Sequence, residues 1–261
     1  MRSLSIAATG MLAQQLNVEV ISNNIANVNT SAYKRRRAEF QDLLYQSQRR
    51  VGSTSAANGS VVPAGVQIGL GVKTAAVYRI TEQGNLVTTD NPFDLAIQVE
   101  GYFQVELPSG DTAYTRAGSF QISGDGELVT VDGYRLQPAI TIPPDAVDVT
   151  INGSGDVLAK IAGQVTPQNV GTIQLAAFAN DAGLEATGDN LFVETPASGT
   201  ATTGNPGNAG FGTLSQGFLE TSNVNVVQEI TNLITAQRAY EMNSKVIQAS
   251  DEMMAQLNQL R

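Results

Sequence analysis

Residues 22–34 read SNNIANVNTSAYK, and this stretch sets the organisation of the first part of the chain. It follows a helical pattern and brings four asparagines together with isoleucine, alanine and valine. Asparagine is a mediocre helix former because its side chain competes for nearby backbone groups. Near the other end, residues 220–230 read ETSNVNVVQEI, where asparagines again border a helical pattern. Both ends therefore predict a long helix with an asparagine-rich boundary towards the middle of the chain.

Apolar residues recur every seven positions near both ends, which makes a narrow stripe typical of helices that pack on helices. Polar residues interrupt the stripes at Gln14, Asn243 and Ser250. Two ordinary amphipathic helices on the domain's own core are the alternative. We predict that helices within residues 1–33 and 220–261 pair in a coiled-coil-like inner domain. The rows are Leu4, Met11, Val18 and Ile25, with Ile21 and Val28 adjoining, and Val226, Leu233, Tyr240, Ile247 and Met254, flanked by Leu257.

Between the predicted helices the residue pattern changes to that of a β domain. Residues 73–219 contain short alternating segments separated by glycine-containing turns, which is typical of antiparallel hairpins. Residues 34–72 connect to this domain, and within them residues 46–63 form a small, polar extension. The predicted fold class is α+β, with a central, mainly antiparallel β domain. The predicted strands are 73–80, 95–107, 113–122, 127–131, 146–151, 157–161, 172–179 and 191–194.

The composition of the 261 residues excludes several classes of function. A net charge of −9 argues against a general nucleic-acid binder, which needs a basic face to neutralise phosphates. The exception is the basic run at residues 34–37, which we interpret as a solvated helix start. Cysteine and histidine are both absent, so disulfides, thiolate or imidazole metal sites and Ser-His-Asp catalysis are excluded. We expect no cofactor, no metal and no enzymatic activity.

Carboxylates remain available for chemistry. Asp125 and Glu127 could serve as the paired acids of a glycan hydrolase. Acidic residues beside glycine in a hairpin turn explain the same positions more simply. The beginning of the chain, MRSLSIAATGMLAQQ, does not have the uninterrupted apolar stretch of a cleaved signal peptide, and no segment is long enough for a membrane helix. We expect a protein without a cleaved leader.

Three groups of motifs resemble those of bacterial flagellar rod and hook proteins. Residues 22–34 with the following RRRAEFQDLLYQ are similar to the N-terminal signature of this family, and residues 220–260 are similar to its C-terminal signature, with QRAYE at 237–241 as the most specific part. In the middle, DLAI precedes GYF, and YTRAGSF follows at 114–120. Chain length and residues 46–71 are most similar to the distal rod members, and other rod or hook subunits are the alternatives.

The resemblance implies a structural subunit that assembles with copies of itself into a rigid hollow helical tube, which transmits torque from motor to hook. It implies a rod that spans the periplasm to the outer membrane, export through the flagellar type III apparatus, and contacts with proximal rod proteins, the hook protein and the L- and P-ring proteins. The apolar rows, with Gln237 and Arg238, are then the expected subunit interface. The extension is expected to add rigidity through Arg49, Arg50, Val51, Val61 and Val62.

The asparagines then have a role as helix caps. Asn27 and Asn29 are placed to end the first helix, because asparagine tolerates the left-handed conformation and can cap free carbonyls. Ser222, Asn223 or Asn225 can cap the last helix by accepting hydrogen bonds from its free N–H groups.

The chain departs from the family pattern at two positions. Ala32 and Val99 stand where the family has glycine, so we expect any left-handed backbone there to be strained or absent. From another class of function, a monomeric binding or adhesin module on a β scaffold stays open, and such a module would remain monomeric at rising concentration.

Overall fold

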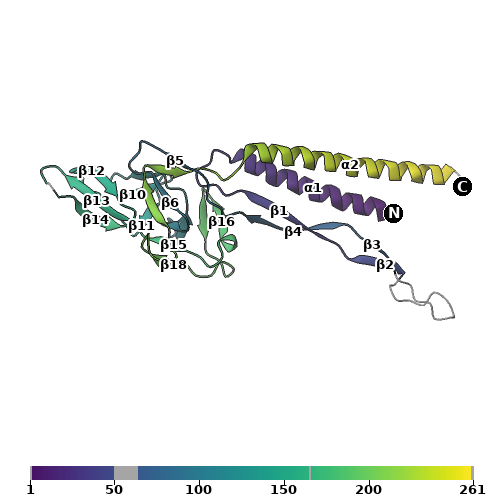
Figure 1. Ribbon diagram of the computed structural model, residues 1–261, viewed down its shortest axis with the longest axis horizontal. Coiled ribbons are helices and arrows are strands. Elements are labelled where there is room, and N and C mark those ends of the chain that lie inside the picture. Colours follow the sequence, from purple (N-terminus) through teal and green to yellow (C-terminus); the bar gives the residue numbers. More distant parts are fainter. Residues whose placement is uncertain (1, 50–63, 165, 260–261) are drawn as a thin grey trace. The chain divides into compact units, whose positions relative to one another are not determined.

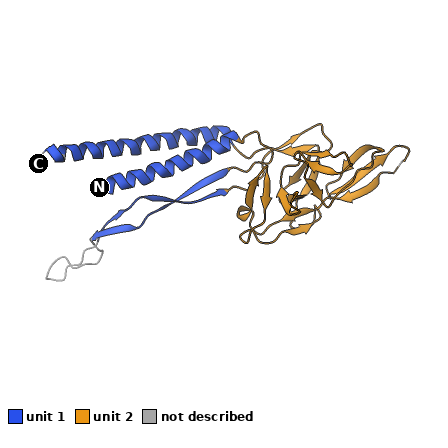
Figure 2. Cartoon of the chain, turned by 180° about the vertical axis from the view of Figure 1, so that it is seen from behind, with its two compact units in different colours: residues 1–26, 36–78, 225–261 blue, residues 27–35, 79–224 orange. Residues whose placement is uncertain are grey.

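A computed structural model describes residues 2–49, 64–164 and 166–259. The chain forms two compact units (Figure 2). Unit 1 comprises Met1–Ala26, Arg36–Tyr78 and Asn225–Arg261, and unit 2 comprises Asn27–Arg35 and Arg79–Val224. The division differs from the four predicted ranges, because the terminal helices share a unit with the strands of the predicted connection at residues 34–72.

Unit 1 consists of two long helices and a strand arm (Figure 1). The helices are α1 (Arg2–Ala26) and α2 (Val226–Gln259), which run antiparallel and lie side by side. The arm consists of two paired ribbons, β1 (Arg36–Asp42) with β4 (Val72–Arg79) and β2 (Tyr45–Arg49) with β3 (Val66–Gly69). The terminal helices therefore pair with each other, as the sequence predicts.

The beginning of α2 follows from its sequence. None of its 34 residues is glycine or proline, so no helix breaker interrupts it. Asn225 stands directly before the helix, and its Oδ1 accepts a hydrogen bond from the backbone N–H of Gln228 at 3.2 Å. This bond satisfies one of the N–H groups that have no partner within the helix, and such a cap contributes about 1 kcal/mol. Glu229 in the first turn adds a favourable charge at the positive end of the helix dipole.

Unit 2 is a β structure of short antiparallel strands (Figure 1). Its largest sheet runs β16-β17-β8-β7-β11-β10-β9, with β15 pairing to both β7 and β18. A second sheet runs β12-β13-β14, and β5 pairs with β20 and β6 with β19. The strands are β5 (Leu86–Thr88), β6 (Leu95–Gln98), β7 (Tyr102–Glu106), β8 (Thr112–Thr115), β9 (Phe120–Ile122), β10 (Leu128–Thr130), β11 (Arg135–Gln137), β12 (Ala146–Ile151), β13 (Asp156–Ile161), β14 (Gln168–Thr172), β15 (Leu175–Ala177), β16 (Glu185–Gly188), β17 (Leu191–Val193), β18 (Thr202–Gly204), β19 (Thr213–Gln216) and β20 (Phe218–Glu220), with a 3-10 turn η1 (Asp181–Gly183).

The core of unit 2 lies between these sheets. Phe103 on β7 and Phe120 on β9 are almost completely buried, and their rings meet edge to face with centroids 5.0 Å apart. Leu95 and Ile97 bring β6 into the same cluster, and Val157 brings in β13. Residues from all parts of residues 93–214 share this core, so the short strands are stabilised together.

The structure corrects two expectations. The predicted strands at 95–107, 113–122 and 172–179 are each two strands separated by a turn or loop. The basic run at 34–37 is not a solvated helix start, because Arg36 begins β1 and Lys34 is buried. At Ala32 (φ 56°) and Val99 (φ 77°) left-handed backbone is present, the first of the two alternatives expected there, whereas neither Asn27 nor Asn29 adopts it.

The predicted α+β class is confirmed, with paired terminal helices and a central antiparallel β region. In the described part of the chain, no helix has the length and apolar character to cross a membrane. Among the same residues, no group of acidic side chains is arranged to hold a metal ion.

Candidate assembly surface

Asn24, near the end of α1, forms side-chain hydrogen bonds to two other elements of unit 1. Its Nδ2 donates to the backbone carbonyl of Arg36 at 2.8 Å, and its Oδ1 accepts from the N–H of the same residue at 2.8 Å. Nδ2 also donates to Oε2 of Glu229 at 3.1 Å. Asn24 is 2% exposed. One buried amide therefore connects α1 to the start of β1 and to the first turn of α2, which no apolar side chain could do.

The other predicted caps have individual roles. The backbone carbonyl of Asn27 accepts from the N–H of Thr30 at 3.2 Å and closes the turn after α1. Asn29 is exposed in the same turn. Ser222 Oγ accepts from the N–H of Val224 at 3.3 Å, and Asn223 bonds to the backbone of residues 35, 80 and 82. Of the three candidates before α2, only Asn225 bonds to a backbone N–H of the helix among the bonds seen in the described chain.

The line along which α1 and α2 meet is made of small and polar side chains. Ser3 and Ser250 face each other with their hydroxyl oxygens 3.3 Å apart. Gly10 leaves space for Asn243, because a Cβ on Gly10 would lie 2.8 Å from Asn243 Nδ2. Asn24 meets Glu229 at the other end of the line. We call the residues Ser3, Gly10, Asn17 and Asn24 of α1 and Glu229, Ala236, Asn243 and Ser250 of α2 the polar seam.

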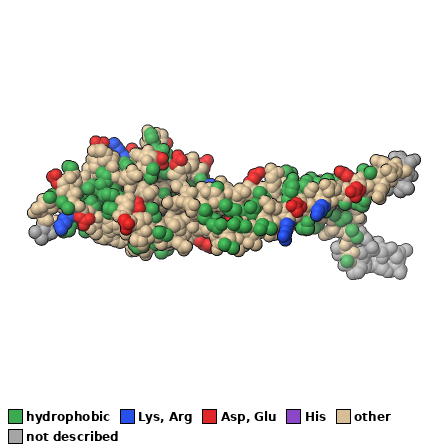
Figure 3. Space-filling model, turned by 90° about the horizontal axis from the view of Figure 1, so that it is seen from above, with side chains coloured by type: hydrophobic (Ala, Val, Ile, Leu, Met, Phe, Trp, Pro, Cys, Tyr) green, Lys and Arg blue, Asp and Glu red, His purple; other side chains and the backbone are tan. Residues whose placement is uncertain are grey.

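The predicted apolar rows are mostly half-buried, and three of their residues on α2 are exposed. Ile21 is buried, whereas Leu4, Met11, Val18 and Ile25 are half-buried on α1. Figure 3 shows hydrophobic side chains running along the helical part of the molecule. On α2, Val226, Tyr240 and Met254 are exposed by 37%, 44% and 37%. Leu233 and Ile247 are half-buried, and the polar residues Gln237 and Arg238 are exposed. Val28 belongs to unit 2 and is half-buried there. The side chain of Leu257 lies outside the described residues.

Further apolar side chains on α2 are exposed, although not all of them lie on the side of the predicted rows. Val227, Ile230, Ile234 and Met242 are exposed by 76%, 45%, 46% and 62%. The last turns of α2 also extend beyond the point where Ser250 meets Ser3 near the start of α1, and Met253 there is 54% exposed. Exposed apolar side chains gathered on one side of a soluble chain often mark a surface that binds a partner. We define the predicted rows on both helices as the apolar face.

The arm approaches α1 on a different side from α2. Thr9 Oγ1 accepts from the N–H of Val72 at 3.3 Å and donates to the carbonyl of Ile6 at 2.7 Å. Gly71 makes this approach possible, because its φ is 128° and a Cβ there would lie 2.2 Å from Thr9 Oγ1. Leu44 and Tyr45 on the arm are exposed by 83% and 59%. Of the predicted extension, residues 50–63 lie outside the described residues, so Arg50, Val51, Val61 and Val62 do too, as does the side chain of Arg49.

Unit 2 holds a buried charge cluster that the sequence did not reveal. Both oxygens of Glu220, at the end of β20, are used: Oε1 accepts from Lys34 Nζ and Oε2 from Arg116 Nε, each at 2.6 Å. The three side chains are 2%, 5% and 6% exposed for Glu220, Lys34 and Arg116. Burial lowers the pKa of Lys34, and Glu220 opposes this. Lys34 also donates to the carbonyl of Glu82, and the N–H of Gly84 donates to Glu220.

Ala32 and Val99, two of the non-glycine residues with a left-handed backbone, are attached to this cluster. The N–H of Ala32 donates to the carbonyl of Glu220 at 2.8 Å. The carbonyl of Val99 accepts from Arg116 Nη2 at 2.5 Å, and its N–H donates to Gln83. A left-handed backbone costs about 1–2 kcal/mol in such residues, so it persists where neighbouring bonds hold it.

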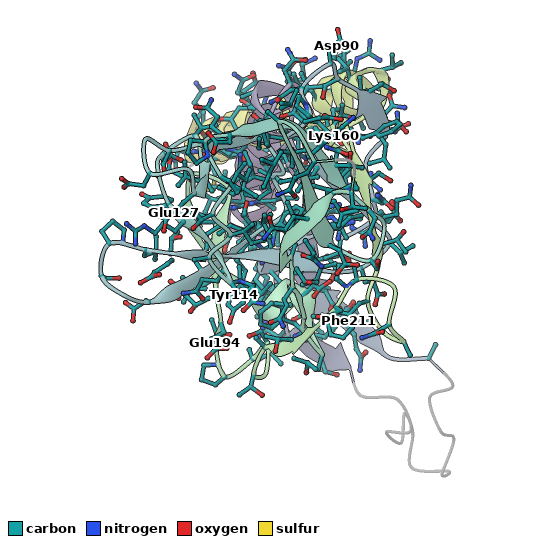
Figure 4. The ribbon with its side chains drawn as sticks, turned by 90° about the vertical axis from the view of Figure 1, so that its left-hand side faces the viewer. Asp90, Tyr114, Glu127, Lys160, Glu194 and Phe211 are labelled. Atoms are coloured by element: carbon teal, nitrogen blue, oxygen red, sulfur yellow. The ribbon has the colours of Figure 1, made fainter. Side chains whose placement is uncertain are left out.

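The surroundings of Asp125 and Glu127, the two carboxylates considered for catalysis, are explained without a paired-acid site. Glu127 accepts from Arg135 Nε at 2.9 Å and lies towards the rim of unit 2 (Figure 4). Asp125 lies in the turn before β10 and lines an open pocket of about 580 Å³ whose other lining residues include Pro92, Phe93 and Ile142. An ion pair and a hairpin turn account for the two side chains.

The signal that could have revealed the polar seam was present in the sequence. Asn243 and Ser250 interrupt the apolar stripe at a spacing of seven, and Glu229 and Ala236 continue that spacing towards the start of α2. Read as a row of their own, these residues indicate the side of α2 that faces α1. The charge cluster had no such signal, because Lys34 and Glu220 are 186 positions apart.

Comparisons with known proteins identify the family. Three family models match: the flagella basal body rod protein over residues 4–34, the flagellar hook protein FlgE/F/G D1 domain over 96–159, and the flagellar basal body rod FlgEFG protein C-terminal over 215–260. The chain is 62% identical over 261 residues to the flagellar basal-body rod protein FlgG of Caulobacter vibrioides, covering 100% of both. It is 56% identical to FlgG of Agrobacterium fabrum over 97% of both chains, and 40% identical to FlgG of Bacillus subtilis over 100% of this chain and 99% of that one. These matches confirm the resemblance read from residues 22–34 and 220–260, and the chain belongs to the family of flagellar basal-body rod proteins.

Proposed function

We propose that this protein is a structural subunit of the flagellar distal rod, which assembles with copies of itself into a rigid hollow helical tube. Relatives that align along the full length and carry the basal-body rod name support this role. The observation that carries the mechanism is the uneven distribution of polarity on the helix pair. Polar residues line the seam within the chain, and the apolar face is partly exposed, most of all at Val226, Tyr240 and Met254.

The apolar face has the character of a contact between copies. Seven-residue spacing of apolar side chains is the pattern that packs helices against helices, and the partner on the seam side is already α1. A second helix pair can therefore cover Val226, Tyr240 and Met254 without displacing anything inside the chain. Tyr240 has a large apolar ring and a hydroxyl that needs a hydrogen-bond partner. Such a side chain suits an interface in which the ring is buried and the hydroxyl reaches a polar group or water.

Gln237 and Arg238 complete the proposed interface. Both are exposed on α2 between Leu233 and Tyr240, where they can bond across a contact that the apolar rows bring together. Leu257 flanks the row beyond Met254, seven residues after Ser250, and we include it in the proposed interface. A rim of polar side chains around an apolar centre is the usual composition of an interface between proteins.

The wider setting of this function follows from the family. We infer contacts with proximal rod proteins, the hook protein and the L- and P-ring proteins, and export through the flagellar type III apparatus. The rod would span the periplasm to the outer membrane. No nucleic acid, cofactor or enzymatic activity is part of the proposal, because the chain is acidic and contains neither histidine nor cysteine.

The experiment compares assembly with folding. Purified protein is incubated at rising concentration, and particle mass is followed by light scattering and electron microscopy. Val226, Tyr240 and Met254 are replaced together by serine, and Gln248→Ser, at an exposed polar position of α2, is the matched control. We expect tubes from the parent chain and the control, and none from the triple variant, with unit 2 melting at the same temperature in all three. Unchanged tube formation by the triple variant would refute the proposed interface.

Two other functions predict different results. A monomeric binding or adhesin module keeps a constant mass at all concentrations. Another rod or hook subunit of the family also forms tubes, but hook-like tubes are curved, whereas distal rod tubes are straight.

A further inference from the structure

The polar seam repeats with a regularity that packing alone does not require. Along α1, Ser3, Gly10 and Asn24 lie on a seven-residue spacing, and each step towards the C-terminus of α1 matches an equal step back along α2. The contacts Ser3–Ser250, Gly10–Asn243 and Asn24–Glu229 therefore share one antiparallel register. The same register places Asn17 opposite Ala236, which is 2% exposed.

Each layer of the seam is matched in size or in hydrogen bonding. Asn24 donates to a carboxylate that is 5% exposed, so the charge of Glu229 is not left buried without a donor. Gly10 has no side chain where the Asn243 amide lies. Ser250 is 1% exposed and has the hydroxyl of Ser3 within 3.3 Å. In the observed register, each of these α1 residues thus fits the α2 residue opposite it.

We propose that the polar seam, and not the apolar rows, sets the register of α1 on α2, and that this register is what aligns the two halves of the apolar face for a second copy of the chain. Rows of similar apolar side chains pack nearly as well after a shift of one heptad, so they define the register weakly. Buried polar residues define it strongly, because a shift leaves them without partners. The consequence for assembly rests on the proposed function, whereas the register itself does not.

A shift by one heptad moves one helix by about 10.5 Å along the other, since an α-helix rises 1.5 Å per residue. In one direction Asn24 then faces Ala236 and Gly10 faces Ser250, so Glu229 loses its amide donor. In the other direction Gly10 faces Ala236 and Ser3 faces Asn243, so the Asn243 amide meets a side chain in place of a glycine. The competing explanation is that the register is set by the connections, meaning the segments that follow the end of α1 and precede the start of α2.

The absence of cysteine from the chain makes the register measurable, because introduced pairs are the only thiols present. Asn17→Cys with Ala236→Cys reports the native register. Asn17→Cys with Asn243→Cys, and Ser3→Cys with Asn243→Cys, report shifts of one heptad in the two directions. A disulfide forms only when the two Cα atoms are within about 7 Å, so a pair displaced by a heptad does not close. The purified, dilute chain is oxidised, and the cross-linked peptides are measured by mass spectrometry.

Each cysteine pair is measured in three backgrounds. The first is the parent chain, the second carries Asn24→Leu with Glu229→Leu, and the third carries Gln15→Leu with Gln248→Leu at exposed positions as the matched control. We expect the parent and the control to cross-link through the native pair at least tenfold more than through either shifted pair. In the seam variant, a shifted pair should rise to the same order as the native pair.

Two results would overturn the inference. A seam variant that still cross-links only through the native pair would show that the connections set the register. Comparable cross-linking of native and shifted pairs in the parent chain would show that the seam sets none. Because these readouts come from the free chain, they stand whether or not tubes form. The proposed effect of the register on assembly is tested with the seam variant without cysteines. This variant should lose most tube formation, while unit 2 melts at an unchanged temperature. Normal tube formation would refute the link between register and assembly.

Discussion

Replacing Glu220 by glutamine tests the buried charge cluster of unit 2. The substitution keeps the shape of the side chain and removes its charge, so Lys34 and Arg116 remain buried without a counterion. All three side chains are at most 6% exposed, and water cannot take over the lost contacts. Breaking a buried ion pair by removing one partner costs about 3–5 kcal/mol. The remaining bonds of Arg116 to the carbonyls of residues 97, 99 and 101 reduce the loss only in part.

The assay is thermal and urea unfolding of the full chain, followed by the near-ultraviolet circular dichroism of tyrosine, to which the buried Tyr102 and Tyr114 of unit 2 contribute. For a unit of this size, each kcal/mol shifts Tm by about 2–4 °C, so Glu220→Gln should lower Tm by about 6–20 °C. Glu127→Gln is the matched control, because it breaks the half-exposed pair with Arg135 and should cost less than about 1 kcal/mol. Equal, small losses in both variants would refute the reasoning.

The same cluster predicts a pH dependence. Burial alone would raise the pKa of Glu220, and Arg116 and Lys34 outweigh it, so the pKa lies below its usual value. A lowered pKa in the folded state stabilises the fold fully above the ordinary value of about 4.3, and this stabilisation is lost as the pH falls through the folded value. Glu220→Gln should therefore flatten the acid side of the stability profile below about pH 4.3. An unchanged acid limb in the variant would assign the loss to other carboxylates.

Three further predictions concern single features. Tyr240→Ala should lower the extent of tube formation by at least tenfold and shift the melting of unit 2 by less than about 1 °C, because the side chain is 44% exposed on α2; equal losses in both would place Tyr240 in a folding core. Val99→Gly should raise the stability of unit 2 by up to about 1 kcal/mol, because the side chain is 69% exposed and glycine relieves the left-handed backbone, whereas Ala146→Gly in β12 should lower it, and a destabilised Val99→Gly would contradict the strain. Deleting residues 49–60 should still allow tubes but make them curved or compliant, as measured by persistence length in electron micrographs; tubes as straight and stiff as the parent's would show that the extension is only a tether.

The sequence predicted the parts of the fold that depend on local pattern. The heptad spacing in both terminal segments predicted two long helices that meet, and hairpin turns predicted an antiparallel middle. The boundary at residues 22–34 was also visible, because clustered asparagines rarely continue a helix. The role of Asn24 was not visible, since it depends on Arg36 and Glu229 being brought to the same place by the fold.

The sequence misled where long-range contacts override local preference. Charges at residues 34–37 suggest solvent, yet Lys34 is buried because Glu220 and the carbonyl of Glu82 reach it. Ala32 and Val99 are poor residues for a left-handed backbone, yet both adopt it because bonds of the same cluster hold them. In the candidate interface, the apolar rows drew attention away from the polar row between them, which is where the helices meet.

A reconstruction of the assembled tube from electron cryo-micrographs would show which side of the helix pair contacts a neighbouring copy. We predict straight hollow tubes in which the helix pair of each copy lies towards the axis, with Leu233, Tyr240 and Ile247 against a neighbouring copy and the Asn24–Glu229 contact retained within each chain. Tubes in which these apolar side chains face solvent, or contacts between copies made by unit 2 alone, would contradict it.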